Sequence, residues 1–407
     1  MRKIVHDILG EVRSIQVMVM CLLHDGAMWT CIAAQLLPEL KGVSRHNQTS
    51  GRRCNTLRRS MFTGASRAIF LPAWLFCASL LLPVAPVRAA DRQGLLAMQQ
   101  IDQRVTAIGY RLVTSAGDLC SDQTPVLGFA VHDLSQYGQD EQTVVRDVFG
   151  FDGAPLVLAV APDSPVATAG IQTGDALIRI GADPVAPAPA RATASYARVA
   201  AILSQLDSAG HSGTLALELR RKQQVFMVTA TLRNGCPTRF QTKVSDTIDA
   251  QADGRYVEVN TGLIAFAGSD EQLAAIMAHE LAHNILHHRA RLDAAGVPRG
   301  ILGQFGKNAR LIRETEAEAD RLGVYLMDRA GYAPQGAIAF WTRFGAEHGL
   351  GIFTAPTHLS EGKRIALIQA EIDRMAAMRA AGEEPRPAFM EHARPCVSNG
   401  PTGDYSR

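Results

Sequence analysis

The sequence predicts an α+β protein in which a small β-rich domain precedes a mostly helical domain. Residues 124–235 contain short apolar runs separated by glycines and prolines, a pattern typical of short strands and turns. Residues 238–380 contain long segments in which apolar residues recur every three or four positions, which indicates packed helices. A chain of 407 residues is long enough for two or three domains.

The composition excludes some classes of function. A formal net charge of +2 gives no electrostatic basis for binding nucleic acid. Seven cysteines are present without a CxxC pair, which argues against a zinc knuckle or a thioredoxin-type site.

The segment 61–90 has the layout of a secretory signal peptide. Arg67 precedes a long apolar run, and the small residues Ala89 and Ala90 close it, so we expect cleavage after one of these two. Translation is then expected to begin at Met61, and residues 1–60 are not part of the native product. The protein would be exported to the periplasm. An uncleaved signal anchoring it to the membrane is the alternative, so membrane or envelope association and oligomeric state stay open.

Residues 91–123 are predicted to form a lead-in helix followed by a strand near Tyr110–Val113. Cys120 and Cys236 bracket the β-rich segment and can form a disulfide in an oxidising compartment, with free buried thiols as the alternative. The tail, residues 383–407, is rich in proline, glycine and polar residues and is predicted to be flexible.

Within residues 124–235, Leu156–Val160 reads as a strand. Ser164 then caps a short helix that has Pro165 at its first position and Gly170 just past its end. With the following "GDALIRIGADPV", this resembles a PDZ domain of the bacterial periplasmic-protease type. The resemblance implies that extended polypeptide ends bind beside an exposed strand, with "LGFAV" (residues 127–131) as the carboxylate-binding loop. The alternative, which the sequence favours equally, is that this domain serves as a spacer or a lid.

The stretch "AHELAHNILHH", residues 278–288, carries the strongest signal. Ser269 caps a helix that is predicted to reach about His288. At 100° per residue, His279 and His283 lie on one face of this helix, 40° apart. Two buried imidazoles need a partner, and a bound Zn²⁺ ion would supply one. Glu280 points away from the metal seam, where its carboxylate can reach a water; these are the roles of the HExxH motif.

A carboxylate on a second helix supplies the third ligand. Leu286 and Arg289 stand where the metzincin pattern needs glycine and histidine, which excludes that class. Downstream, Glu316 and Asp320 share one helix face in "RETEAEAD". With these motifs the chain resembles the HtpX / CAAX prenyl protease-type family of gluzincin zinc metallopeptidases, in its soluble exported branch. The resemblance implies one Zn²⁺ ion held by the two histidines and Glu316, with Asp320 as a supporting hydrogen-bond partner.

Further residues take their expected roles from the same resemblance. In "PTHLSEGKRIALI", residues 356–368, His358 and a downstream arginine would lie near the active site, although Leu359 replaces the usual proline. His358 would stabilise the oxyanion of the tetrahedral intermediate. The strand formed by Val257, Glu258, Val259 and Asn260 would either pair with substrate or only pack in the sheet.

Three neighbouring polar residues are predicted to lie outside the metal site. Glu314 and Glu318 are predicted to be solvated, and His288 is predicted to face away from the metal.

The predicted function is an exported zinc-dependent endopeptidase that hydrolyses polypeptide substrates, namely envelope or misfolded proteins. Glu280 takes a proton from the attacking water, whose pKa the metal lowers toward ~7. An envelope chaperone or assembly factor with little proteolysis is the alternative. A PDZ scaffold with structural zinc is disfavoured, because structural zinc normally has four protein ligands and the sequence offers three in register.

Overall fold

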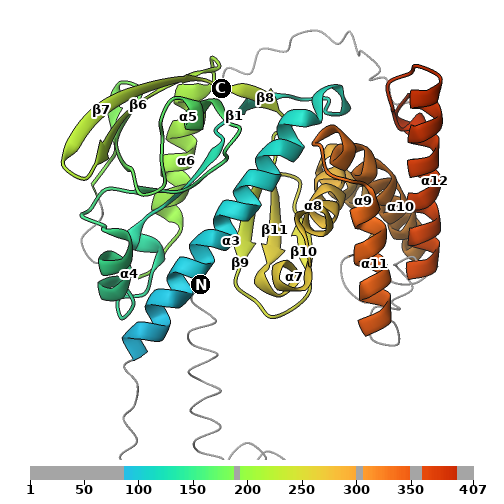
Figure 1. The fold of residues 1–407 in the computed structure, drawn as a ribbon, viewed down its shortest axis with the longest axis horizontal. Helices are drawn as coiled ribbons and strands as arrows, with labels where there is room; N and C mark the ends of the chain where they lie inside the picture. The colour runs from blue at the N-terminus through green and yellow to red at the C-terminus, as the bar shows by residue number, and fades with distance from the viewer. Residues whose placement is uncertain (1–86, 188–192, 299–305, 349–359, 392–407) are drawn as a thin grey trace, which may run out of the picture. The chain divides into compact units, whose positions relative to one another are not determined.

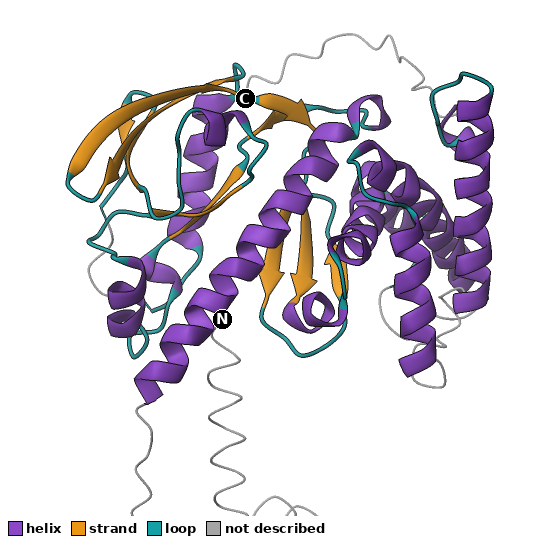
Figure 2. Ribbon diagram, viewed as in Figure 1, coloured by secondary structure: helices purple, strands orange, loops and turns teal. Residues whose placement is uncertain are grey.

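The computed structural model describes residues 87–187, 193–298, 306–348 and 360–391 (Figure 1). Within these ranges, every strand lies between residues 124 and 260, and the segments after residue 260 are helical (Figure 2). This mixture of helix and sheet is compatible with the predicted α+β class.

The helices are α3 (Val87–Ser115), α4 (Gln142–Phe149), α5 (Pro165–Thr168), α6 (Ala197–Gly210), α7 (Thr261–Phe266), α8 (Asp270–Ile285), α9 (His288–Ala294), α10 (Gly306–Arg329), α11 (Gln335–His348), α12 (Glu361–Ala380) and α13 (Ala388–Glu391). The strands are β1 (Thr124–Val126), β2 (Phe129–His132), β3 (Leu156–Val160), β4 (Ala176–Ile180), β5 (Asp183–Pro184), β6 (Thr214–Arg221), β7 (Gln224–Thr231), β8 (Arg233–Gly235), β9 (Arg239–Lys243), β10 (Ala250–Ala252) and β11 (Tyr256–Asn260).

Helix α3 runs through the segment near Tyr110–Val113, so the strand predicted there is wrong. The apolar run at its end belongs to the helical period, because the buried Ile108 and Leu112 are four residues apart and lie on one face. That face packs into the core of the helical domain. Gly109 allows a close approach to β9, since a Cβ atom at this position would overlap the ring of Phe240.

The β-rich domain is built on a sheet with strand order β2-β3-β4-β6-β7, in which neighbouring strands are antiparallel and β5 pairs with β4. Helix α5 begins as predicted after Ser164, whose hydroxyl accepts a hydrogen bond from the Ala167 amide at 3.2 Å. Helix α6 packs on the sheet and buries Ile202 and Leu206 against it. Strand β2 lies at one edge of the sheet.

A disulfide joins the two ends of the β-rich domain. Cys120 precedes β1, Cys236 follows β8, and their Cα atoms are 5.6 Å apart. Strands β1 and β8 pair antiparallel directly beside this bond. The chain therefore enters and leaves the β-rich domain at adjacent points.

The helical domain opens with a three-stranded sheet of order β10-β11-β9, in which β11 is antiparallel to β10 and parallel to β9. Helix α8 packs against α10, α11 and the sheet, so it is surrounded by protein over most of its length. Its Leu273 and Met277 are fully buried with Leu322 of α10 and Phe340 of α11. The helix that carries the HExxH motif is thus the centre of the core.

The tail contradicts the sequence prediction over part of its length. Residues 383–391 are described, and α13 packs Phe389 and Met390 against the helical core. The guanidinium of Arg321 lies 4.9 Å from the centroid of the Phe389 ring. The prediction of a flexible tail is therefore wrong for these residues, because two large apolar side chains find a surface to cover. Cys396 lies outside the described residues.

Residues 1–86 also lie outside the described residues, and they include most of the predicted signal peptide, 61–90, and the segment upstream of it. Among the helices of the described ranges, none combines the length and the apolar character that crossing a membrane requires.

Candidate metal centre

Helix α8 carries both histidines of the HExxH motif. The Ser269 hydroxyl caps the helix by accepting a hydrogen bond from the Gln272 amide at 3.3 Å. The helix ends at Ile285, earlier than the predicted end near His288. His279 and His283 lie one turn apart on it, and their Nε2 atoms are 3.1 Å apart.

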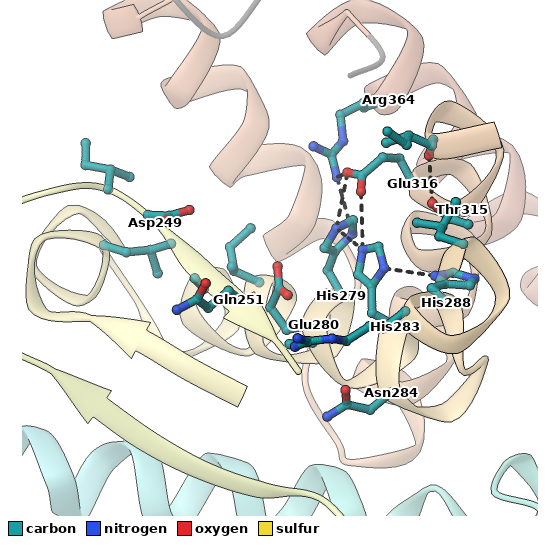
Figure 3. Close-up of a pocket in the computed structure, with 18 of the residues that line it drawn as sticks. Asp249, Gln251, His279, Glu280, His283, Asn284, His288, Thr315, Glu316 and Arg364 are labelled. Carbon is teal, nitrogen blue, oxygen red and sulfur yellow. Dashed lines mark hydrogen bonds and ion pairs between the residues drawn. The ribbon is translucent and has the colours of Figure 1, made fainter. Parts of the chain in front are cut away.

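Helix α10 brings the third predicted ligand to the same point. The carboxylate oxygens of Glu316 lie 3.6 Å from His279 Nε2 and 3.4 Å from His283 Nε2 (Figure 3). One donor atom from each of the three residues lies within 4.8 Å of the others. Donors at the corners of a tetrahedron around zinc, each about 2.0–2.1 Å from the metal, are about 3.3–3.4 Å apart. The separations to the two different oxygens of Glu316 are close to this spacing, so the three residues are suitably placed to hold a single tetrahedral ion and would leave one corner free of protein.

A buried ion pair supports His279 from the side opposite the donor cluster. Its Nδ1 atom lies 3.0 Å from Asp320 Oδ1, and Arg364 of α12 donates to both oxygens of Asp320, at 2.5 and 2.8 Å. The Arg364 guanidinium also lies 3.7 Å from the centroid of the Trp341 ring. Arg364 Nη2 also lies 3.2 Å from His279 Nδ1. With a metal ion on Nε2, the proton of a neutral His279 would sit on Nδ1, where Asp320 can accept it.

The charges around His279 also favour a cation. Burial alone would lower the pKa of His279, but hydrogen bonds to Asp320 and Glu316 outweigh it and raise this pKa to about 10. Burial is likewise the largest influence on Asp320, yet Arg364 and His279 hold the pKa of its carboxyl below its usual value. Without a metal ion, His279 therefore holds a proton on each nitrogen near neutral pH, and a metal ion that binds Nε2 would displace one of these protons.

Glu280 faces a cavity of about 730 Å³ beside the donor cluster. Burial, with a smaller contribution from the negative charge of Glu316, raises the pKa of Glu280 to about 8. A carboxylate held in such surroundings is suited to exchanging protons near neutral pH. The cavity is lined on its apolar side by Leu263, Ile276, Phe340, Trp341 and Phe344.

The predicted substrate strand, Val257 to Asn260, is not available for pairing. Strand β11 lies in the middle of the sheet, where Val257 pairs with Ala252 on one side and Phe240 on the other. Its backbone is occupied on both sides, so the prediction that it pairs with substrate is wrong. Strand β10 forms the edge instead, and its three residues line the cavity together with Glu280.

Two residues that were expected to be remote from the metal are part of the site. His288 is only 1% exposed and contacts His283, whereas the sequence placed it on the surface. Glu318 is partly buried and bonded to His288, whereas it was expected to be solvated. Glu314 is exposed, as predicted, and pairs with Arg310 at 3.4 Å. His358 lies outside the described residues.

Comparisons with known proteins point to the same chemistry. Residues 216–306 match the model of Peptidase family M48. The mitochondrial metalloendopeptidase OMA1 of Schizosaccharomyces pombe is 31% identical over 137 residues, covering 28% of this chain and 41% of that protein. The putative beta-barrel assembly-enhancing protease of Vibrio cholerae is 29% identical over 123 residues, covering 23% of this chain and 25% of that protein. The match thus spans less than half the length of either relative. These similarities support a relationship of this chain to the M48 family of zinc metallopeptidases.

Proposed function

We propose that the chain is an exported zinc-dependent endopeptidase of the soluble M48 type. The single observation that carries this proposal is the donor set of His279, His283 and Glu316, with Glu280 beside it in an open cavity. Three protein donors leave a position for water or substrate, which is the arrangement of catalytic zinc sites, whereas structural zinc normally has four protein ligands.

The residues around the site divide the work of peptide hydrolysis. Zinc, when bound, supplies Lewis-acid chemistry that polarises a carbonyl group and acidifies water. The Glu280 carboxylate accepts the proton of the attacking water and returns it to the amine that leaves. Asp320 keeps the His279 proton on Nδ1, and Arg364 keeps Asp320 ionised and in place.

Polypeptide substrates would bind along strand β10. An extended chain can add to an exposed sheet edge through backbone hydrogen bonds, and β10 is the edge strand on the cavity side. The aromatic residues Phe340 and Trp341 would take an apolar side chain of such a substrate. We therefore assign substrate pairing to β10, whereas β11 has the alternative role considered for it, packing within the sheet.

The β-rich domain is proposed to bind peptides as PDZ domains do. Strand β2 and helix α6 line one side of a second cavity of about 960 Å³, separate from the metal centre, and α3 and β9 line the other side. Gly128 precedes β2 with a φ of 73°, a conformation that suits glycine. It lies in the segment 127–131, to which the resemblance assigns carboxylate binding. Misfolded or C-terminally exposed chains are the substrates that this domain would select.

Export is supported by two features. The segment 61–90 has the layout of a signal peptide, and the Cys120–Cys236 disulfide would persist in an oxidising compartment. We therefore propose the periplasm as the location, with an uncleaved signal as the route to membrane anchoring. One relative is named as a protease that enhances β-barrel assembly, which favours envelope proteins as substrates.

The second candidate function is an envelope chaperone or assembly factor that cleaves little. The peptide-sized cavity at β2 favours it, because this cavity could hold client chains without the metal centre. The two candidates differ in whether Glu280 is required.

The deciding experiment is hydrolysis of unfolded casein by the zinc-loaded protein. We expect cleavage that a chelator abolishes and added zinc restores. Glu280→Gln should lower the rate at least 100-fold while zinc content and melting temperature stay close to wild type. Glu314→Gln is the matched control, because it changes an exposed carboxylate of α10 that does not touch the site. Casein left intact by the zinc-loaded wild type, with client binding retained, would instead support the chaperone.

A further inference from the structure

A second chain of hydrogen bonds leads away from the candidate metal centre, through His283. His283 Nδ1 lies 2.8 Å from His288 Nδ1 (Figure 3). His288 Nε2 lies 2.9 Å from Glu318 Oε2. Arg291 completes the chain by donating to Glu318 at 2.6 Å. The imidazole of His288 is therefore held at both nitrogens, between a metal-ligand histidine and a carboxylate.

The backbone explains how His288 comes to lie behind His283. Helix α8 ends at Ile285, and His287 adopts the left-handed conformation with φ 51° and ψ 37°. This reversal lets α9 start at His288 in a new direction, so that the side chain turns back beneath the last turn of α8. A non-glycine residue with positive φ is uncommon, and it marks a turn that the surrounding structure maintains.

The proton assignment along this chain has a single solution once His283 binds a metal through Nε2. A neutral His283 must then carry its proton on Nδ1 and donate it to His288 Nδ1. His288 must accept at Nδ1, so its own proton sits on Nε2 and is donated to Glu318. A doubly protonated His288 would place two N–H groups against each other.

We propose that His288 and Glu318 are positioning residues that hold His283 in the tautomer and orientation that bind the metal. The arrangement mirrors the other side of the site, where Asp320 and Arg364 hold His279. The Asp320 carboxylate contacts His279 directly, whereas His288 lies between His283 and the Glu318 carboxylate. This inference rests on the proposed function, because it requires that the donor set binds zinc.

Substitutions at residue 288 separate positioning from packing. His288→Phe fills the buried space but cannot accept the His283 proton. His288→Gln keeps an amide oxygen to accept that proton and an N–H group for Glu318. We expect the affinity for zinc, measured by competition with a chromophoric chelator, to fall 10- to 100-fold in the phenylalanine variant. The glutamine variant should recover most of this loss.

The visible absorption spectrum of the cobalt-substituted protein provides a readout that general stability does not move. Cobalt reports ligand geometry, so His288→Phe should alter the ligand-field bands and His288→Gln should restore them. Glu318→Ala should weaken zinc binding in the same direction, whereas Glu314→Ala, on the exposed face of α10, should not. The melting temperature of the metal-free proteins shows whether each variant folds.

The outcomes distinguish this inference from the proposed function. A wild-type protein that binds no zinc would overturn both. Wild-type affinity and an unchanged cobalt spectrum in His288→Phe would overturn the inference alone, because His288 would then serve only to fill space. If the phenylalanine variant does not fold, Glu318→Ala decides: wild-type zinc affinity in that variant would overturn the inference, and weaker binding would support it.

Discussion

Gly323 of α10 sets the distance between the two helices that carry the metal donors. A Cβ atom at this position would lie 3.4 Å from the His279 amide nitrogen and 3.5 Å from His279 Cα. These distances are at the near limit of ordinary contact, so Gly323→Ala fits, and the better helix propensity of alanine, about 1 kcal/mol, offsets the tight contact. We expect this variant to keep its zinc affinity and a melting temperature near wild type.

Gly323→Val should not fit. Its γ-carbons extend about 1.5 Å beyond Cβ, into the backbone of α8. Overpacking of this kind costs about 1–3 kcal/mol, which corresponds to a loss of about 2–12 °C in melting temperature for a domain of this size. The helices must also separate. Because a metal site tolerates displacements of only about 0.5 Å, and Glu316 lies two turns away on the same helix, zinc affinity should fall at least tenfold.

Thermal melting of the metal-free protein and chelator competition measure the two effects separately. Gly362→Val is the matched control, because a Cβ atom at this helical position would meet nothing within 4 Å. The reasoning would be refuted by a Gly323→Val protein that binds zinc as tightly as wild type, since the crossing would then not control the donor geometry.

Two further predictions concern regions outside the metal centre. Burial raises the pKa of Asp102 from 3.8 to about 6, although a hydrogen bond from Thr242 opposes it. The folded state therefore holds this proton to a higher pH than the unfolded chain, and stability should fall by up to about 3 kcal/mol as pH rises from 4 through 6. Asp102→Asn should remove this loss, so that urea unfolding shows the variant gaining on wild type at pH 7.5 but not at pH 4; an equal difference at both pH values would contradict the assignment. Reducing the Cys120–Cys236 disulfide should lower stability by about 4–5 kcal/mol from the entropy of a loop with a sequence separation of 116, measured by denaturant unfolding with and without reductant. An unchanged midpoint would mean that other contacts already hold the two ends together.

The regular parts of the fold could be predicted from local patterns. The strand Leu156–Val160 and the helix capped by Ser164 lie where they were predicted, because each has a periodicity or a cap that few alternatives share. The approach of His279, His283 and Glu316 also agrees with the spacing of the motifs.

The sequence predictions were wrong where a tertiary contact or a local irregularity of the backbone overrides the hydrophobic periodicity. His288 was placed by extending α8 at 100° per residue, but the left-handed His287 ends that helix and redirects the chain. The contact of Glu318 with His288 was missed for the same reason, because it depends on where His288 lies. Strand β10 has three residues and no distinctive pattern, so nothing in the sequence showed that it, and not β11, forms the edge of the sheet.

The position of the disulfide has a consequence for how this protein could be rearranged. Because the Cα atoms of Cys120 and Cys236 are only 5.6 Å apart, the β-rich domain behaves as a cassette with its two ends at one attachment point. A linker of about two residues could close this gap if the domain were removed. A different module whose own ends lie equally close together could take the place of the domain without moving either helix of the metal centre. Under the proposed function, exchanging this domain would change which substrates are selected and leave the cleavage chemistry with the helical scaffold. A library of such chimeras would test whether the two properties separate.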